Sequence, residues 1–235
     1  MSVALTLDGR GHQALAAWAA GVLAQSRLAS QGRPAPRKVT VADEPDEALV
    51  ERARRNEPGA IELLYDRHAA AVYRRLSHLV GPDPEREDLM QEVFVDLFHQ
   101  LGSYRGEASL RTYLFRIVSN KAHDHLRQRQ RQRRATGETP RFSAIDDPDH
   151  GDLRSSAPSP EDRVGHAQEL ALVGQALDKL SPKKRIAFLL RVVENLSLKE
   201  IAQQVGATVF TVAQRIRYAD RELHRLIDRG RRKQP

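Results

Sequence analysis

Beyond the first 45 residues, the apolar residues of this chain recur at the three- and four-residue spacing of an α-helix, almost without interruption. No segment shows the apolar–polar alternation of a half-buried strand. Gly81 and Pro82 end one helix. Asp83 is expected to cap the next helix, with Pro84 at its first position, and Ser109 the one after. The pattern predicts an all-α protein, because amphipathic helices bury their apolar faces by packing against one another.

Composition divides the 235 residues into four parts. Residues 44–134 and 161–230 carry the helical pattern and are expected to form two small domains. Residues 135–160 hold four prolines and no apolar periodicity, which predicts a flexible linker. Residues 1–43 form an N-terminal extension, either partly disordered and dispensable or a regulatory docking helix. Within the second domain we expect helices at about 161–179, 182–194, 198–204 and 208–227.

The charge balance is basic: 38 Lys and Arg residues against 31 Asp and Glu give a net charge of +7. Such a chain is attracted to polyanions by its long-range field. The absence of cysteine excludes disulfides and thiolate zinc sites, and fits a reducing cytosol. The longest apolar run, residues 14–24, is about half of what spans a bilayer. We therefore expect a cytoplasmic protein without a membrane span, with a secretory signal in this run as the alternative.

Residues 197–223 have the pattern of a helix-turn-helix. Ser197 and Glu200 form a capping box before a short amphipathic helix. Gly206 permits a tight turn, and Thr208 can cap a second helix. That helix would bury Val212, Ile216, Ala219, Leu223 and Ile227. On or near its exposed side are Phe210, Thr211, Gln214, Arg215, Arg217, Tyr218 and Arg221. Arg and Gln on such a face suit hydrogen bonds to base edges in the major groove, whereas the alternative is an ordinary helical hairpin with a solvated basic face.

Three segments stand out from the general helical pattern: residues 86–97 (REDLMQEVFVDL), 104–120 (YRGEASLRTYLFRIVSN) and 180–223. Together they resemble RNA polymerase sigma factors of the extracytoplasmic-function type, within the sigma-70 family. The first is similar to the family's polymerase-binding helix, the second to the loop and helix that read and open the −10 promoter element, and the third to the −35-binding domain. The resemblance covers about residues 47–227 apart from the linker.

The resemblance implies a transcription initiation factor that binds core RNA polymerase, through the clamp helices of β′ and the flap of β, and promoter DNA. The resemblance also implies an anti-sigma factor as a partner, and it implies no cofactor. The implied polymerase contacts are Asp88, Gln91, Glu92 and Asp96. The implied −10 contacts are Ser103, Tyr104, Arg105, Arg111, Arg116, Asn120, Lys121 and Arg127. The implied −35 contacts are Arg191, Thr208, Phe210, Thr211, Gln214, Arg215, Arg217 and Tyr218.

The chain departs from the family pattern at four positions. Many relatives have Trp where this chain has Tyr113, which we expect to be the most buried of the aromatic and cationic residues in the −10 loop and helix. Relatives often have Gly at Phe210 and basic residues at Ala213 and Asp220. The missing cation at Ala213 leaves the −35 sequence open.

Two other functions remain open: a one-component repressor or activator that uses the C-terminal helix-turn-helix, and an adaptor whose basic helices bind another protein. An enzyme is not expected, since no nucleophile with a positioned base can be nominated. His123 and His125 point to different faces of a helix, so we expect no metal site there.

Overall fold

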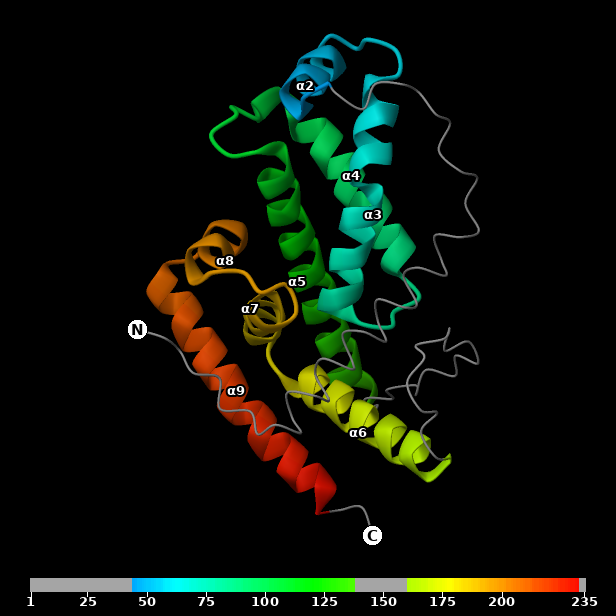
Figure 1. The fold of residues 1–235 in the computed structure, drawn as a ribbon, viewed down its shortest axis with the longest axis vertical. Coiled ribbons are helices and arrows are strands. Elements are labelled where there is room, and N and C mark those ends of the chain that lie inside the picture. The colour runs from blue at the N-terminus through cyan, green and yellow to red at the C-terminus, as the bar shows by residue number, and fades with distance from the viewer. Residues whose placement is uncertain (1–43, 138–159, 233–235) are drawn as a thin grey trace.

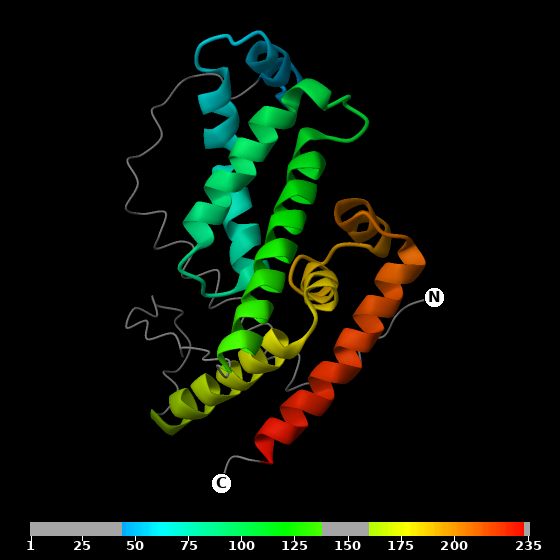
Figure 2. The same ribbon diagram turned by 180° about the vertical axis from the view of Figure 1, so that it is seen from behind.

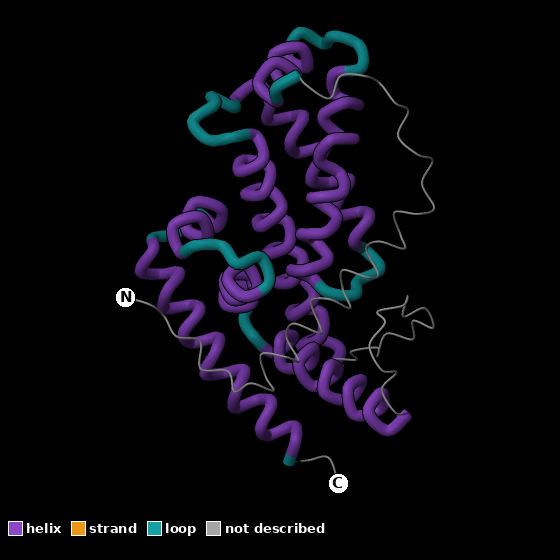
Figure 3. Tube along the Cα trace, viewed as in Figure 1, coloured by secondary structure: helices purple, strands orange, loops and turns teal. Residues whose placement is uncertain are grey.

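The computed structural model describes residues 44–137 and 160–232. Every regular element in these two stretches is a helix (Figure 3), which confirms the all-α prediction. The expectations for residues 1–43 and for most of the linker lie outside the described residues. The elements are α2 (Asp46–Arg54), α3 (Ala60–Val80), α4 (Arg86–Gln100), the short 3-10 helix η1 (Leu101–Ser103), α5 (Leu110–Thr136), α6 (Pro160–Lys179), α7 (Pro182–Val192), α8 (Leu198–Val205) and α9 (Val209–Arg231).

The first module consists of α2 to α5. α3, α4 and α5 pack against one another, and α2 lies at one end of this bundle (Figure 1). Leu64, Leu76 and Leu114 are completely buried between them, and the rings of Tyr65 and Phe94 meet at 4.6 Å. Burial of such side chains contributes about 1.5–3 kcal/mol each, so this core holds the module together.

The second module consists of α6 to α9. α7 packs against α9 and α8, and α6 packs against α9 near its C-terminal end (Figure 1). Phe188 is completely buried at the centre of this module. The predicted stripe of α9 is confirmed, because Val212, Ile216, Ala219, Leu223 and Ile227 are all buried.

The local signals at most helix ends are confirmed. Ser197 and Glu200 form the capping box of α8, and Gly206 follows it with a positive φ of 60°. The hydroxyl of Thr208 accepts a hydrogen bond from the backbone N–H of Thr211 at 3.1 Å, which caps α9. Ser109 caps α5 in the same way.

The expectation that Asp83 is the N-cap residue of α4 is wrong by two residues, because Glu85 occupies that position. α4 begins only at Arg86, after a turn that contains Pro84. Asp83 is buried, and its carboxylate lies 2.8 Å from His125 Nε2 on α5. The other carboxylate oxygen of Asp83, Oδ1, accepts a hydrogen bond from the backbone N–H of Glu85 at 3.0 Å. Asp83 therefore caps the turn that precedes α4 and contacts α5 at the same time.

The two modules pack directly against each other. α7 and α8 lie against α5, and α7 also contacts α3, as the views from both sides show (Figures 1 and 2). Arg185 of α7 is buried and donates to the carbonyl oxygens of Leu79 and Val80 at 3.0 and 2.9 Å. These carbonyls end α3 and have no partner within the helix, so α7 completes the C-terminal turn of the first module.

Candidate polymerase and DNA interfaces

The acidic face of α4 is largely open to solvent. Asp88, Gln91 and Glu92 are exposed and Asp96 is half-buried. Lys121 Nζ of α5 lies 3.2 Å from Glu92 and 3.1 Å from Asp96. Burial opposes the charge of Lys121, but its two carboxylate partners outweigh that effect and raise its pKa. Lys121, a predicted −10 contact, therefore forms ion pairs with two residues of the predicted polymerase face.

The loop between η1 and α5 is shaped by Tyr104. Its hydroxyl donates to the carbonyl of Ala108 at 2.6 Å, and its ring lies 5.3 Å from that of Tyr113. Arg54 of α2 donates to the carbonyls of Tyr104 and Leu101. Tyr104 is buried and Tyr113 only half-buried, so the expectation that Tyr113 is the most buried of the aromatic and cationic residues is wrong. A loop that folds around Tyr104 exposes its other polar residues instead.

The exposed residues of this loop and of α5 form a basic surface. Ser103 at the end of η1 and Arg105 on the loop are exposed, and the exposed members on α5 are Arg111, Arg116, Asn120 and Arg127. The arginine run at the end of α5 is divided between solvent and protein contacts. Arg129 pairs with Asp83, and Arg133 lies 3.1 Å from Asp178 of α6. Part of this run therefore joins the modules in this structure.

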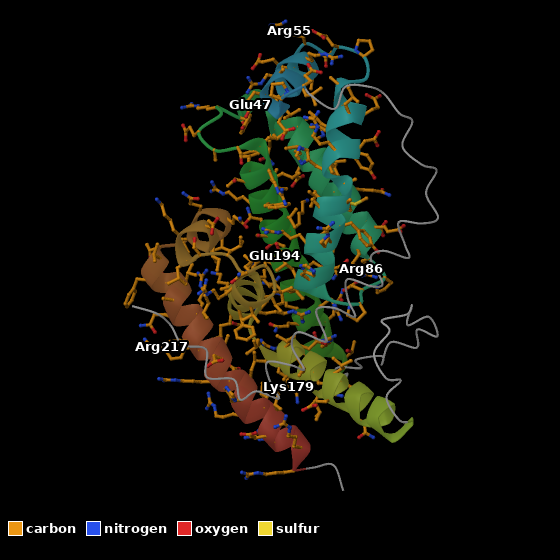
Figure 4. The ribbon with its side chains drawn as sticks, viewed as in Figure 1. Glu47, Arg55, Arg86, Lys179, Glu194 and Arg217 are labelled. Carbon is orange, nitrogen blue, oxygen red and sulfur yellow. The ribbon has the colours of Figure 1, made fainter. Side chains whose placement is uncertain are left out.

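The predicted −35 surface lies at the N-terminal end of α9, which we call its head. Phe210, Arg217 and Tyr218 are exposed, and Arg217 donates to Gln214 Oε1 at 2.7 Å. Figure 4 places Arg217 on the outer side of α9. Thr208 and Thr211 flank the start of the helix, with their hydroxyls 2.8 Å apart.

Four of the predicted −35 residues are half-buried: Arg191, Thr211, Gln214 and Arg215. Arg191 belongs to α7 and donates to the carbonyl of Leu196 at 2.9 Å, which supports the turn before α8.

A polar cluster that no sequence signal indicates joins the modules. It consists of Arg75, His78, Glu194 and Gln204, and we call it the clasp. Glu194 lies 2.7 Å from Arg75 Nη2 and 2.8 Å from His78 Nδ1 (Figure 4 shows its place). Arg75 also donates to Gln204 of α8 and stacks over the ring of Phe115, 3.8 Å from its centroid. Burial opposes ionisation of Glu194, but the hydrogen bond from His78 and the charge of Arg75 outweigh it and lower its pKa to about 2.

The clasp partners lie more than a hundred residues apart in sequence, at separations of 116 to 129. Periodicity and capping rules concern near neighbours, so neither could identify this cluster.

Metal ligation finds no support in the described residues, which contain no group of three or more suitable side chains. His125 contacts Asp83, whereas His123 lies 3.1 Å from Asp124. Among the residues that the structure describes, no helix is long and apolar enough to cross a bilayer.

The fold and these surfaces define a two-module helical protein with a helix-turn-helix of the DNA-binding kind. Two family descriptions match the chain: Sigma-70 region 2 over residues 64–132 and Sigma-70, region 4 over residues 170–219. Each match lies within one of the two expected domains.

Curated relatives extend over both modules. The chain is 31% identical to the RNA polymerase sigma-H factor of Pseudomonas aeruginosa over 176 residues, which are 75% of this chain and 90% of the relative. It is 30% identical to the ECF RNA polymerase sigma-E factor of Escherichia coli K12, over 73% of this chain and 88% of the relative. The fold resembles that of the sigma factor RpoE in complex with the anti-sigma factor NepR from Bartonella quintana, with a TM-score of 0.51, 21% identity, and coverage of 72% of this chain and 98% of the other.

The chain belongs to the sigma-70 family of RNA polymerase sigma factors, as a member of the extracytoplasmic-function type. Members of this family are transcription initiation factors, and this chain acts in promoter-directed initiation.

Proposed function

We propose that this sigma factor binds core RNA polymerase through α4, reads and opens the −10 element with α5 and the loop before it, and reads the −35 element with α9. The observation that carries the proposal is the separation of charge between these elements. The exposed side chains of α4 include Glu87, Asp88 and Glu92, whereas those of α5 and α9 include Arg116 and Arg217. An acidic helix repels phosphate and suits a basic protein surface, while the arginines suit DNA.

The α9 surface supports readout of duplex DNA. In a helix-turn-helix the second helix enters the major groove, with its N-terminal residues at the base edges. Gln214 and Arg217 are the residue types that bond adenine and guanine there, each with about 1–3 kcal/mol of discrimination. Their mutual hydrogen bond of 2.7 Å holds both polar groups on one exposed face.

The loop and α5 support capture of a single strand. Opening a base pair costs a few kcal/mol of stacking, which contacts in a pocket can recover. Tyr104 holds the loop in shape while Ser103 and Arg105 remain exposed to contact an extruded base. Arg111 and Arg116 would then hold the backbone of that strand.

The two modules must part before both elements can be bound. Elements named −10 and −35 lie about 25 base pairs apart, roughly 85 Å of duplex. In this structure a Cβ on Gly206 would lie 3.9 Å from Arg116 Nη2, and α9 begins three residues later. The head of α9 therefore lies on the order of 10 Å from a proposed −10 contact. We infer that the clasp opens on the promoter, with residues 138–159 as the tether.

We further propose that an anti-sigma factor regulates this chain. The similar fold of RpoE was solved in complex with the anti-sigma factor NepR. A partner that binds both modules while they are packed together would keep the clasp closed and block access to both promoter elements.

The test is transcription by purified chain and core RNA polymerase on a library of random promoter sequences. Start sites that depend on the chain, with selected sequences near −10 and −35, support the proposal. Tight binding of the chain alone to a palindrome would instead identify a repressor or activator. Association with another protein, without any effect on transcription, would identify an adaptor.

A further inference from the structure

Phe210, near the N-terminal end of α9, is exposed and does not pack into the core. Phe210 is 73% exposed, and its neighbour Val209 is 45% exposed. The core of the helix-turn-helix is complete without Phe210, because the buried stripe from Val212 to Ile227 lies on another face of α9. A single exposed apolar side chain is common on protein surfaces, so its position relative to other groups decides what it means.

Phe210 stands on the same stripe of α9 as the polar groups proposed to read bases. Gln214 follows it by four residues and Arg217 by seven, which places all three on one face of an α-helix. Gln214 and Arg217 are hydrogen-bonded to each other on that face. The surface that faces the groove thus combines two hydrogen-bonding side chains with one aromatic side chain, in helical order.

The major groove offers one apolar group that such a side chain can bury. Guanine, cytosine and adenine present only donors and acceptors at the groove edge, whereas thymine also presents its C5-methyl group. A phenyl ring over the polar edges would remove their water without replacing the lost hydrogen bonds, which is unfavourable. Against a methyl group both surfaces are apolar, and their contact is favourable.

We propose that Phe210 is a specificity-determining residue that selects thymine in the −35 element by contact with its C5-methyl group. The inference rests on the proposed −35 function of α9 and adds to it the identity of one base. α9 rises 1.5 Å per residue, so Phe210 and Gln214 lie about 6 Å apart along the helix. The selected thymine should therefore lie about one to two base pairs from the pair that Gln214 contacts.

The test replaces each thymine of the −35 element, one at a time, with deoxyuridine, which lacks only the methyl group. The element is the one selected in the promoter library, and binding of the complete chain with core polymerase is measured by fluorescence anisotropy. We expect replacement at one position to weaken binding of the wild-type complex about threefold to tenfold. For Phe210→Ala we expect weaker binding to the thymine duplex and no further loss with deoxyuridine at that position.

Two variants serve as controls. Val209→Ala removes a neighbouring apolar side chain and should keep the sensitivity to deoxyuridine. Phe210→Leu restores an apolar contact and should recover part of the sensitivity to deoxyuridine. Because Phe210 is exposed, the thermal midpoint of Phe210→Ala should equal that of the wild type, which separates a lost contact from lost folding.

The outcomes separate this inference from the function on which it rests. If the wild-type complex tolerates deoxyuridine everywhere but discriminates against a scrambled −35 element, the Phe210 assignment is overturned and the −35 function stands. Equal sensitivity of Phe210→Ala and wild type at the same position also overturns it. If a scrambled −35 element is bound as well as the selected one, the proposed −35 function itself fails.

Discussion

Glu194 of the second module lies 2.7 Å from Arg75 of the first, and both side chains are largely shielded from water. Removing one partner of a buried pair costs about 3–5 kcal/mol, because the other charge remains buried without compensation. This ion pair is therefore a specific element of the contact between the modules.

Glu194→Ala should shift the free chain toward separated modules. The chain has no cysteine, so Val95→Cys and Asp228→Cys, both at exposed positions, provide one pair of labelling sites for energy transfer. We expect lower transfer efficiency in the Glu194→Ala background than in the labelled parent. Glu62→Ala, which removes an exposed carboxylate from α3, should leave the efficiency unchanged. Equal efficiencies in all three would show that the ion pair does not hold the modules together.

The clasp also predicts a dependence of stability on acid. The pKa of Glu194 is about 2 in the folded chain, against an ordinary value of 4.5. A pKa lowered by folding means that the stabilisation is complete above the unfolded value and is lost as the pH falls toward the folded value. The free energy of unfolding should thus fall more steeply between pH 4.5 and about 2 in the wild type than in Glu194→Gln, by up to about 3 kcal/mol.

Urea denaturation followed by circular dichroism across this range measures that difference. Asp83, whose pKa is also lowered to about 2, titrates in both proteins and so cancels in the comparison. Parallel curves for the two proteins would contradict the assignment of Glu194.

The capping box of α8 should contribute measurably to the free energy of unfolding of the helix-turn-helix. Ser197→Ala removes the hydroxyl that accepts from the backbone N–H of Glu200, and such losses cost about 0.5–2 kcal/mol. Ser181→Ala is the matched control, because Ser181 precedes α7 but makes no side-chain capping bond. Thermal denaturation should show a lower midpoint for the first variant only. Equal midpoints would mean that the box contributes nothing.

Substitution of the polar pair on α9 should change which promoters are used. Gln214→Ala and Arg217→Ala each remove a proposed base contact worth about 1–3 kcal/mol, so selection from a library randomised at −35 should relax at one position. Arg229→Ala removes an exposed charge near the other end of α9 and should leave the selected sequence unchanged. Identical sequence preferences in the wild type and both α9-head variants would refute these contacts.

The sequence predicts those features that local chemistry decides. The capping box at Ser197 and the buried stripe of α9 depend on residues within a few turns of one another, and both are confirmed. Asp83 accepts from the backbone N–H of Glu85 in the turn before α4, while its other carboxylate oxygen meets His125, 42 residues away. The local signal thus indicates where the chain turns into α4, but it gives no sign of the contact with His125.

The proposed site shows the same division between local and distant contacts. Gln214 is half-buried and Arg217 exposed, and the two are hydrogen-bonded on one face of α9, as helical spacing indicates. The burial of Tyr104, by contrast, depends on α2 and on Tyr113, and the clasp depends on side chains from both modules. Such contacts follow from the way helices pack, which periodicity along the chain does not encode.

The central claim is that the acidic face of α4 binds core RNA polymerase while other surfaces engage the promoter. The most direct measurement is equilibrium binding of the purified, fluorescently labelled chain to core polymerase, with no anti-sigma factor present. We predict saturable binding of one chain per core enzyme, weakened at least tenfold by Asp88→Lys and unchanged by Arg229→Ala. Absence of binding by the wild-type chain, or equal affinity of Asp88→Lys and wild type, would contradict the account.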